Sequence, residues 1–180
     1  MPLDIGVGIL LSLIVSHIFG VEPTAVFVVC GVLFALLPDI DILPPLARVS
    51  YDHRSFLHYP AVYVPFMVAI YFWAGPLWGT LFTLAIVLHF IHDTIGLGWG
   101  VAWLWPLTPR KFLFPGEERK ADFGFFMTWL PEQEPALGAK YHKPNWLQEY
   151  YLRPNAVAYI EYGMLLVGIL FLIAHVWGRL

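Results

Sequence analysis

The sequence has few charged residues, one cysteine and no dense run of basic side chains. Charged residues make up 13% of its 180 residues, whereas about a quarter is typical of soluble domains. Cys30 cannot form a disulfide within one chain, and a zinc site built on several cysteines is excluded. The net charge of -3 and the lack of clustered Lys and Arg argue against nucleic acid as a partner. The low share of charged residues, together with 59% hydrophobic residues, indicates that the chain's environment is a lipid bilayer.

Hydrophobic residues make up 59% of the chain and occur in five long runs. Because about 20 mostly apolar residues cross the hydrocarbon layer, we expect an all-α membrane protein, with residues 1–180 forming a single integral membrane domain. The expected transmembrane helices cover about residues 3–19, 24–38, 57–73, 77–95 and 156–177. The first run has no basic flank and no cleavage site, so we interpret it as a retained helix rather than a signal peptide.

Basic residues are concentrated on one side of these helices. The segments 39–58 and 96–155 contain nine of the ten Lys and Arg residues, so the positive-inside rule predicts that both are cytoplasmic. Five crossings then put the N-terminus in the cytoplasm and the C-terminus outside, in a cell (inner) membrane of bacterial or archaeal type. Residues 97–155 are rich in aromatic residues and proline, and we expect a large interfacial cap along the cytoplasmic leaflet. The pattern does not predict the secondary structure of this cap.

Three short motifs rich in acidic residues and histidine lie on the same side. They are LPDID (Leu37–Asp41), DHRSFLH (Asp52–His58) and HFIHD (His89–Asp93), at the end of the second helix, the start of the third and the end of the fourth. On a helix, residues three and four positions apart share a face. In an extended segment after Pro38, residues two positions apart point the same way. The candidate metal ligands are therefore Asp39, Asp41, His53, His58, His89, His92 and Asp93.

Imidazole and carboxylate ligands without thiolates are typical of zinc, manganese or iron sites. Seven candidate ligands are more than one tetrahedral ion needs, so one or two divalent ions are both compatible with the sequence. Arg54 follows His53 directly, and it either pairs with a phosphate or developing oxyanion or anchors the topology. We interpret His17 and His175, near the opposite face, as histidines that are hydrogen-bonded to a neighbouring carbonyl and have no role at the site.

At these motifs the sequence resembles the YdjM-like or YbcI-like family of inner-membrane proteins described as metal-dependent hydrolases. The resemblance covers about residues 6–114. It is carried by LPDID, the His-Arg pair with a following histidine in HRSFLH, and HDTIGLGWGVAWLWP. The resemblance implies metal-dependent hydrolysis and the same seven ligands. The chain departs from the family pattern at Leu57-His58-Tyr59, where relatives carry Thr-His-Ser.

Three functions remain open at this point. The first is a metal-dependent hydrolase acting on a phosphoester or ester, including lipid-like substrates, with Asp93 and Arg54 as the expected catalytic residues. The second is a noncatalytic membrane scaffold stabilised by its metal. The third is a transporter of protons or divalent cations, which is disfavoured because the predicted helices 2, 3 and 4 are almost uniformly apolar beyond the motifs.

Overall fold

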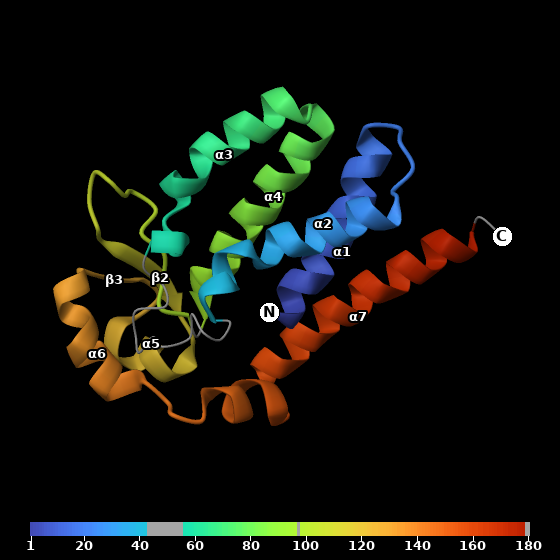
Figure 1. The fold of residues 1–180 in the computed structure, drawn as a ribbon. Coiled ribbons are helices and arrows are strands. Elements are labelled where there is room, and N and C mark those ends of the chain that lie inside the picture. Colours follow the sequence, from blue (N-terminus) through green and yellow to red (C-terminus); the bar gives the residue numbers. More distant parts are fainter. Residues whose placement is uncertain (43–55, 97, 179–180) are drawn as a thin grey trace. The chain divides into compact units, whose positions relative to one another are not determined.

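The computed structural model of the chain describes residues 1–42, 56–96 and 98–178, with positions 41, 42, 117 and 118 described by their backbone alone. The described chain is mostly helical (Figure 1), as the sequence predicts. It divides into two compact units. The first comprises Met1–Leu37, Met67–Ile86 and Pro144–Leu180, and the second comprises Pro38–Phe66 and Val87–Lys143.

In the first unit, helix α1 (Pro2–Ile18) packs against both α2 (Ala25–Leu36) and α7 (Ala156–Trp177). Two of these helices begin at polar caps. The Thr24 hydroxyl accepts a hydrogen bond from a backbone N–H of α2 at 3.1 Å, and the Asn155 side chain does the same for α7 at 3.0 Å. Such caps satisfy N–H groups that have no partner inside the helix, so local sequence fixes where α2 and α7 start.

Helices α3 (Pro60–Trp73) and α4 (Pro76–Asp93) form a hairpin (Figure 1). The turn between them contains Gly75 with a φ of +93°, a conformation that side chains with a Cβ rarely adopt. One turn later, a Cβ on Gly79 would lie 2.6 Å from the Cα of Tyr71. Glycine at these two positions therefore permits both the tight turn and the close approach of the two helices.

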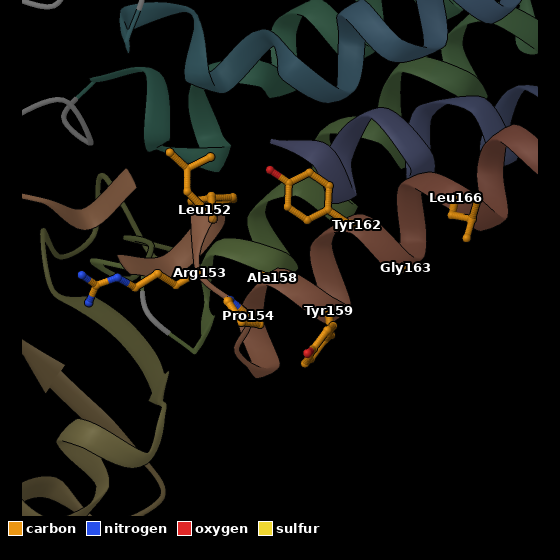
Figure 2. A pocket seen from close by; sticks show the side chains of 9 residues that line it. Leu152, Arg153, Pro154, Ala158, Tyr159, Tyr162, Gly163 and Leu166 are labelled. Atoms are coloured by element: carbon orange, nitrogen blue, oxygen red, sulfur yellow. The ribbon is translucent and has the colours of Figure 1, made fainter. Parts of the chain in front are cut away.

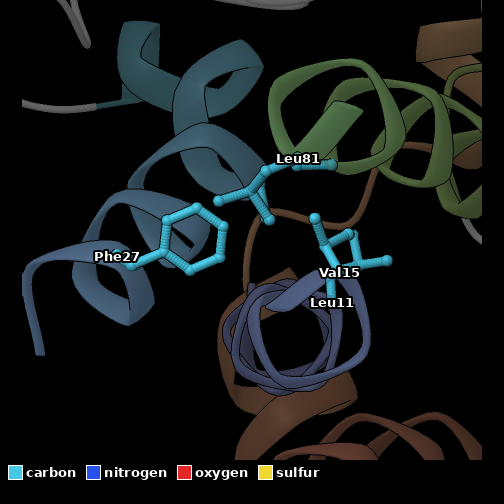
Figure 3. Close-up of a cluster of buried hydrophobic side chains, with 6 residues drawn as sticks. Leu11, Val15, Phe27 and Leu81 are labelled. Atoms are coloured by element: carbon cyan, nitrogen blue, oxygen red, sulfur yellow. The ribbon is translucent and has the colours of Figure 1, made fainter. Parts of the chain in front are cut away.

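The core of the first unit is apolar and comes from helices that are distant in sequence. Figure 3 shows Leu11 and Val15 of α1 facing Phe27 of α2 and Leu81 of α4, and all four are at least nine-tenths buried. The ring of Phe27 meets that of Trp78 edge to face, with centroids 4.9 Å apart. This cluster holds the first unit together by apolar burial and ring packing.

Apolar helices occupy all five segments in which the sequence predicts them. By length and composition, α4 with 18 residues and α7 with 22 residues qualify as membrane spans in the described part of the chain. Helices α1, α2 and α3 are apolar but shorter. The number of crossings, the orientation of the termini and the single-domain organisation therefore stay predictions.

The second unit contains a small sheet, which the expectation of an all-α fold did not include. Strands β1 (Ile95–Gly96) and β2 (Lys111–Pro115) pair in parallel, and β2 pairs with β3 (Met127–Trp129) in antiparallel. The segment 97–155, whose secondary structure the sequence left open, also contains helices α5 (Glu117–Phe123) and α6 (Glu134–Tyr141) and the short helices η4 (Pro131–Gln133) and, in the first unit, η5 (Gln148–Leu152). Alternate residues of β2 and β3 are buried, which is typical of strands with one covered face.

Apolar packing and ion pairs stabilise this segment. Leu113, Met127 and Trp129 form its buried cluster, and the buried Lys111 ammonium lies 2.6 Å from a carboxylate oxygen of Glu134. The Arg119 guanidinium is also buried, stacks over the Trp99 ring at 4.8 Å and donates to the Gly98 carbonyl at 2.8 Å. Residues 98–143 are thus an ordered structure, whereas their position on a leaflet stays a prediction.

Candidate metal centre

Four acidic and histidine side chains converge within the second unit. Asp39 lies in a short 3-10 helix, η1 (Leu37–Ile42), and His58 ends another, η3 (Phe56–His58). His89 and Asp93 lie one turn apart at the end of α4. One ligand atom from each of these four residues lies within 4.8 Å of the others. They are the residues among the seven candidates that the structure brings together.

The distances between the histidine and carboxylate atoms are close to those around a single coordinated ion. The Nε2 atom of His58 lies 3.4 Å from Oδ1 of Asp39 and 3.4 Å from Oδ2 of Asp93. The Nε2 atom of His89 lies 3.7 Å and 3.4 Å from the same two oxygens. Zinc ligands stand about 2.0–2.1 Å from the ion, so the edge of a ligand tetrahedron is about 3.3–3.4 Å. Three of the four measured distances equal this edge and the fourth is slightly longer, so they suit ligands that share one ion. The contact between His58 and Asp39 is also a long hydrogen bond.

Burial and charge also favour a cation at this position. Asp39 is 8% exposed, Asp93 5%, and the two histidines 1% each. Ionised carboxylates are costly to bury without a compensating charge, and a divalent cation balances two of them. Two imidazoles and two carboxylates with no thiolate are a donor set suited to zinc, manganese or iron. The four residues thus fit a divalent metal ion in charge, donor type and spacing.

Aromatic residues hold the two histidines in place. Phe90 is fully buried, and its ring meets those of His58 and His89 with centroids 6.4 Å and 5.9 Å away. Tyr63 and Trp103 pack on the same ring at 5.5 Å and 6.1 Å. Because close-packed rings have little freedom to rotate, Phe90 restricts the orientation of both imidazoles.

Hydrogen bonds fix the end of α4 directly after Asp93. The Thr94 hydroxyl donates to the Phe90 carbonyl at 2.7 Å, and the Trp103 indole N–H donates to that hydroxyl at 2.8 Å. The Thr94 carbonyl accepts from the Phe114 N–H of β2 at 2.7 Å. The sheet thus anchors the helix end that carries two of the four ligands. Sequence reasoning missed this support, although Trp103 belongs to the conspicuous WGVAWLWP segment.

The other predicted site residues have different outcomes. Asp41 lies in η1, with only its backbone described, and His53 and Arg54 lie outside the described residues. His92 is described, lies in the last turn of α4 and is not a member of the four-residue group. Helical geometry gives the reason, since residues three and four positions after His89 point about 100° apart. The structure places Asp93 in the group and directs His92 elsewhere.

Two local predictions at the ligand-bearing segments were wrong. We expected an extended chain after Pro38, but Leu37–Ile42 form the 3-10 helix η1. Proline has no backbone N–H to donate, but the first N–H groups of any helical turn have no acceptor inside that turn. Pro38 can therefore end α2 and still lie in the first turn of η1. We also expected His58 in the first turn of the third helix. Helix α3 instead begins at Pro60, because the residue before a proline avoids helical geometry.

Comparison with known proteins shows the family of the chain. The model of the family described as YdjM inner membrane protein matches residues 4–178. The chain belongs to this family. It is also 32% identical over 127 residues to the inner membrane protein YbcI of Escherichia coli (strain K12), an alignment that covers 64% of this chain and 68% of YbcI. No solved structure matches the chain. Membership of an inner membrane family identifies the protein as a membrane protein.

Proposed function

We propose that this family member is a membrane-embedded, metal-dependent hydrolase that acts on a phosphoester or ester at the cytoplasmic face. The observation that carries the proposal is the buried group of two imidazoles and two carboxylates with spacings of 3.4–3.7 Å. A divalent ion in such a group supplies Lewis acidity toward a carbonyl or phosphoryl oxygen.

The residues of the site divide the expected tasks. Asp39, His58 and His89 would hold the ion, and Phe90 would keep the two rings in orientation. Asp93 has a second oxygen, so it can either complete the ligand set or accept a proton from an attacking water molecule. We further propose that Arg54 binds the developing negative charge of the substrate, as guanidinium groups do with phosphate.

The expected depth of the metal site in the membrane favours one class of substrate. Two of the four ligands, His89 and Asp93, lie at the end of α4, a helix that qualifies as a membrane span, so the proposed reaction takes place near the headgroup region. A phosphoester or ester of a lipid-like molecule reaches that depth by lateral diffusion in the bilayer. Lipid-like substrates are therefore the first class to screen.

One feature of the site favours a second function, a membrane scaffold stabilised by its metal. Structural zinc sites have four protein ligands, whereas catalytic zinc sites keep one position open for water or substrate. The group here offers four ligands, which fill a tetrahedral ion. A scaffold would use the same ion to fix the ends of η1, η3 and α4 to one another without chemistry.

The direct test combines elemental analysis of purified protein with a phosphatase and esterase screen in detergent. Hydrolase function predicts bound metal in the wild type, turnover of at least one substrate class, and loss of both in His89→Ala. The exposed His17 on α1 provides a matched control, because His17→Ala removes an imidazole from outside the group. Bound metal with no turnover in any class would favour the scaffold. Absence of a bound transition metal from the wild type would refute both functions.

The proposed topology has a separate test. Five crossings with a cytoplasmic N-terminus put a reporter fused after residue 180 on the outer side of the membrane. A reporter active only in the cytoplasm would contradict five crossings, and it would also remove the argument that the metal site faces the cytoplasm.

A further inference from the structure

A groove on the first unit lies along the N-terminal half of α7 and the turn before it (Figure 2). Its volume is about 430 Å³. Tyr159, Gly163 and Leu166 line it from α7, and Arg153 lines it from the preceding turn. None of these residues belongs to the proposed metal centre, and none contributes to the proposed hydrolysis.

The α7 side of this groove is elongated and apolar. Tyr159, Gly163 and Leu166 are four and three positions apart, so they follow one face of the helix. Tyr159 is 69% and Leu166 56% exposed. A Cβ on Gly163 would have no other atom within 4 Å, so this glycine leaves open space where any other residue would place a side chain. An apolar groove along a helix of a membrane protein suits an acyl chain.

The end of the groove carries a positive charge. Arg153 is exposed, and its guanidinium extends outward beyond Pro154 (Figure 2). Within the described ranges, no carboxylate forms an ion pair with Arg153, and none lines the groove. Glu161, the acidic residue of α7, is 3% exposed and accepts a hydrogen bond from the Leu3 N–H at 2.9 Å. The charge of the groove is therefore that of Arg153.

The position of the groove along α7 coincides with the expected surface of the bilayer. Helix α7 has 22 residues and is about 33 Å long, which is close to the thickness of the hydrocarbon layer. Its N-terminal end therefore lies near the headgroups when the helix spans the membrane. Tyr159 and Tyr162 line the groove at this end, and tyrosine is enriched at membrane interfaces.

We propose that this groove binds an anionic glycerophospholipid, with its phosphodiester at Arg153 and one acyl chain along Tyr159, Gly163 and Leu166. The positive end favours lipids with a net negative charge over zwitterionic ones. The lipid is a bound partner of α7 and not a substrate, so the inference does not depend on hydrolysis.

The test is native mass spectrometry of the full-length protein in detergent micelles that contain either phosphatidylglycerol or phosphatidylcholine. We expect the wild type to retain phosphatidylglycerol in preference. Arg153→Gln should weaken that binding about fivefold, since one basic residue near a membrane contributes about 1 kcal/mol, whereas Arg153→Lys should keep most of it. Lys140→Gln, which removes the same charge from α6, is the matched control and should bind as the wild type does.

A second variant tests the apolar part of the groove. Gly163→Leu places its Cβ in open space within the groove and improves helix propensity, so it should fold and should lose retention of both lipids. The proposal is overturned if Arg153→Gln retains phosphatidylglycerol as the wild type does. An equal loss of phosphatidylglycerol binding in Lys140→Gln would also overturn the proposal. So would a wild type that binds no lipid and instead forms a dimer that Gly163→Leu disrupts.

Discussion

Replacement of His58 by alanine is the sharpest perturbation of the candidate metal centre. His58 ends the three-residue helix η3, so its removal does not weaken a long helix. Its Nε2 atom lies 3.4 Å from both carboxylates of the group, and the side chain is 1% exposed. We expect His58→Ala to fold and to bind its metal much more weakly.

The size of this effect follows from the number of ligands. Zinc sites with four protein ligands bind with about 10–16 kcal/mol, which corresponds to about 3 kcal/mol for each ligand. Loss of one ligand should then weaken the affinity about 150-fold. At a free metal concentration about 1,000 times the wild-type dissociation constant, bound metal stabilises the wild type by about 4 kcal/mol, and the variant by about 1 kcal/mol.

Competition with a chromophoric chelator measures the affinity, and thermal unfolding with and without metal measures the stabilisation. His92→Ala is the control, because His92 lies in the same sequence motif as His89 and Asp93 but outside the four-residue group. We expect it to retain affinity within a few-fold of the wild type. Wild-type affinity in His58→Ala, or an equal loss in His92→Ala, would refute the assignment of the four ligands.

Three further predictions concern the fold. Lys111→Met leaves the Glu134 carboxylate without its cation, so it should lower the free energy of unfolding by about 3–5 kcal/mol. Chemical unfolding measures this loss. A double variant that also carries Glu134→Leu should recover part of it. Gly168→Val places a Cβ 2.8 Å from a backbone oxygen of α1 and should cost about 1–3 kcal/mol by overpacking, seen as a lower unfolding temperature. Hydrogen bonds from Lys140 and Tyr141 lower the pKa of Asp122 below its ordinary value of 3.8. These two hydrogen bonds therefore stabilise the fold fully above pH 3.8, and their contribution is lost as the pH falls through the lowered pKa of Asp122. Lys140→Met should raise the pKa of Asp122 in an NMR titration, and an unchanged pKa would contradict this cause.

The helices could be predicted because their signals are local. Continuous apolar runs mark α1, α2, α3, α4 and α7, and the caps Thr24 and Asn155 mark where two of them begin. The sheet could not be predicted in the same way. Strand β1 has two residues and pairs with β2 across about 15 intervening positions, so no periodic pattern distinguishes it from a loop.

The sequence predicted which types of residue form the candidate site, but not which of the seven candidates would meet. The motifs put histidines and carboxylates at three neighbouring helix ends, and four of the seven candidates meet in the described structure. Spacing alone could not separate His92 from Asp93, because residues three and four positions away both count as neighbours of His89. The face that the end of α4 turns toward Asp39 and His58 decides between them. Phe90 and the hydrogen bond between Thr94 and β2 hold this end of the helix, and both are tertiary contacts.

Coordination number provides the physical distinction between the two functions considered for this site. A zinc ion held by both histidines and one oxygen from each carboxylate has four protein ligands, and a closed shell of this kind stabilises a fold but leaves no place for substrate. A manganese ion prefers six ligands in octahedral geometry, so the same four residues leave two positions for water or a substrate oxygen. X-ray absorption of the purified protein measures that number. Four ligands without bound water would favour the scaffold, whereas five or six ligands including water would favour hydrolysis by the same residues.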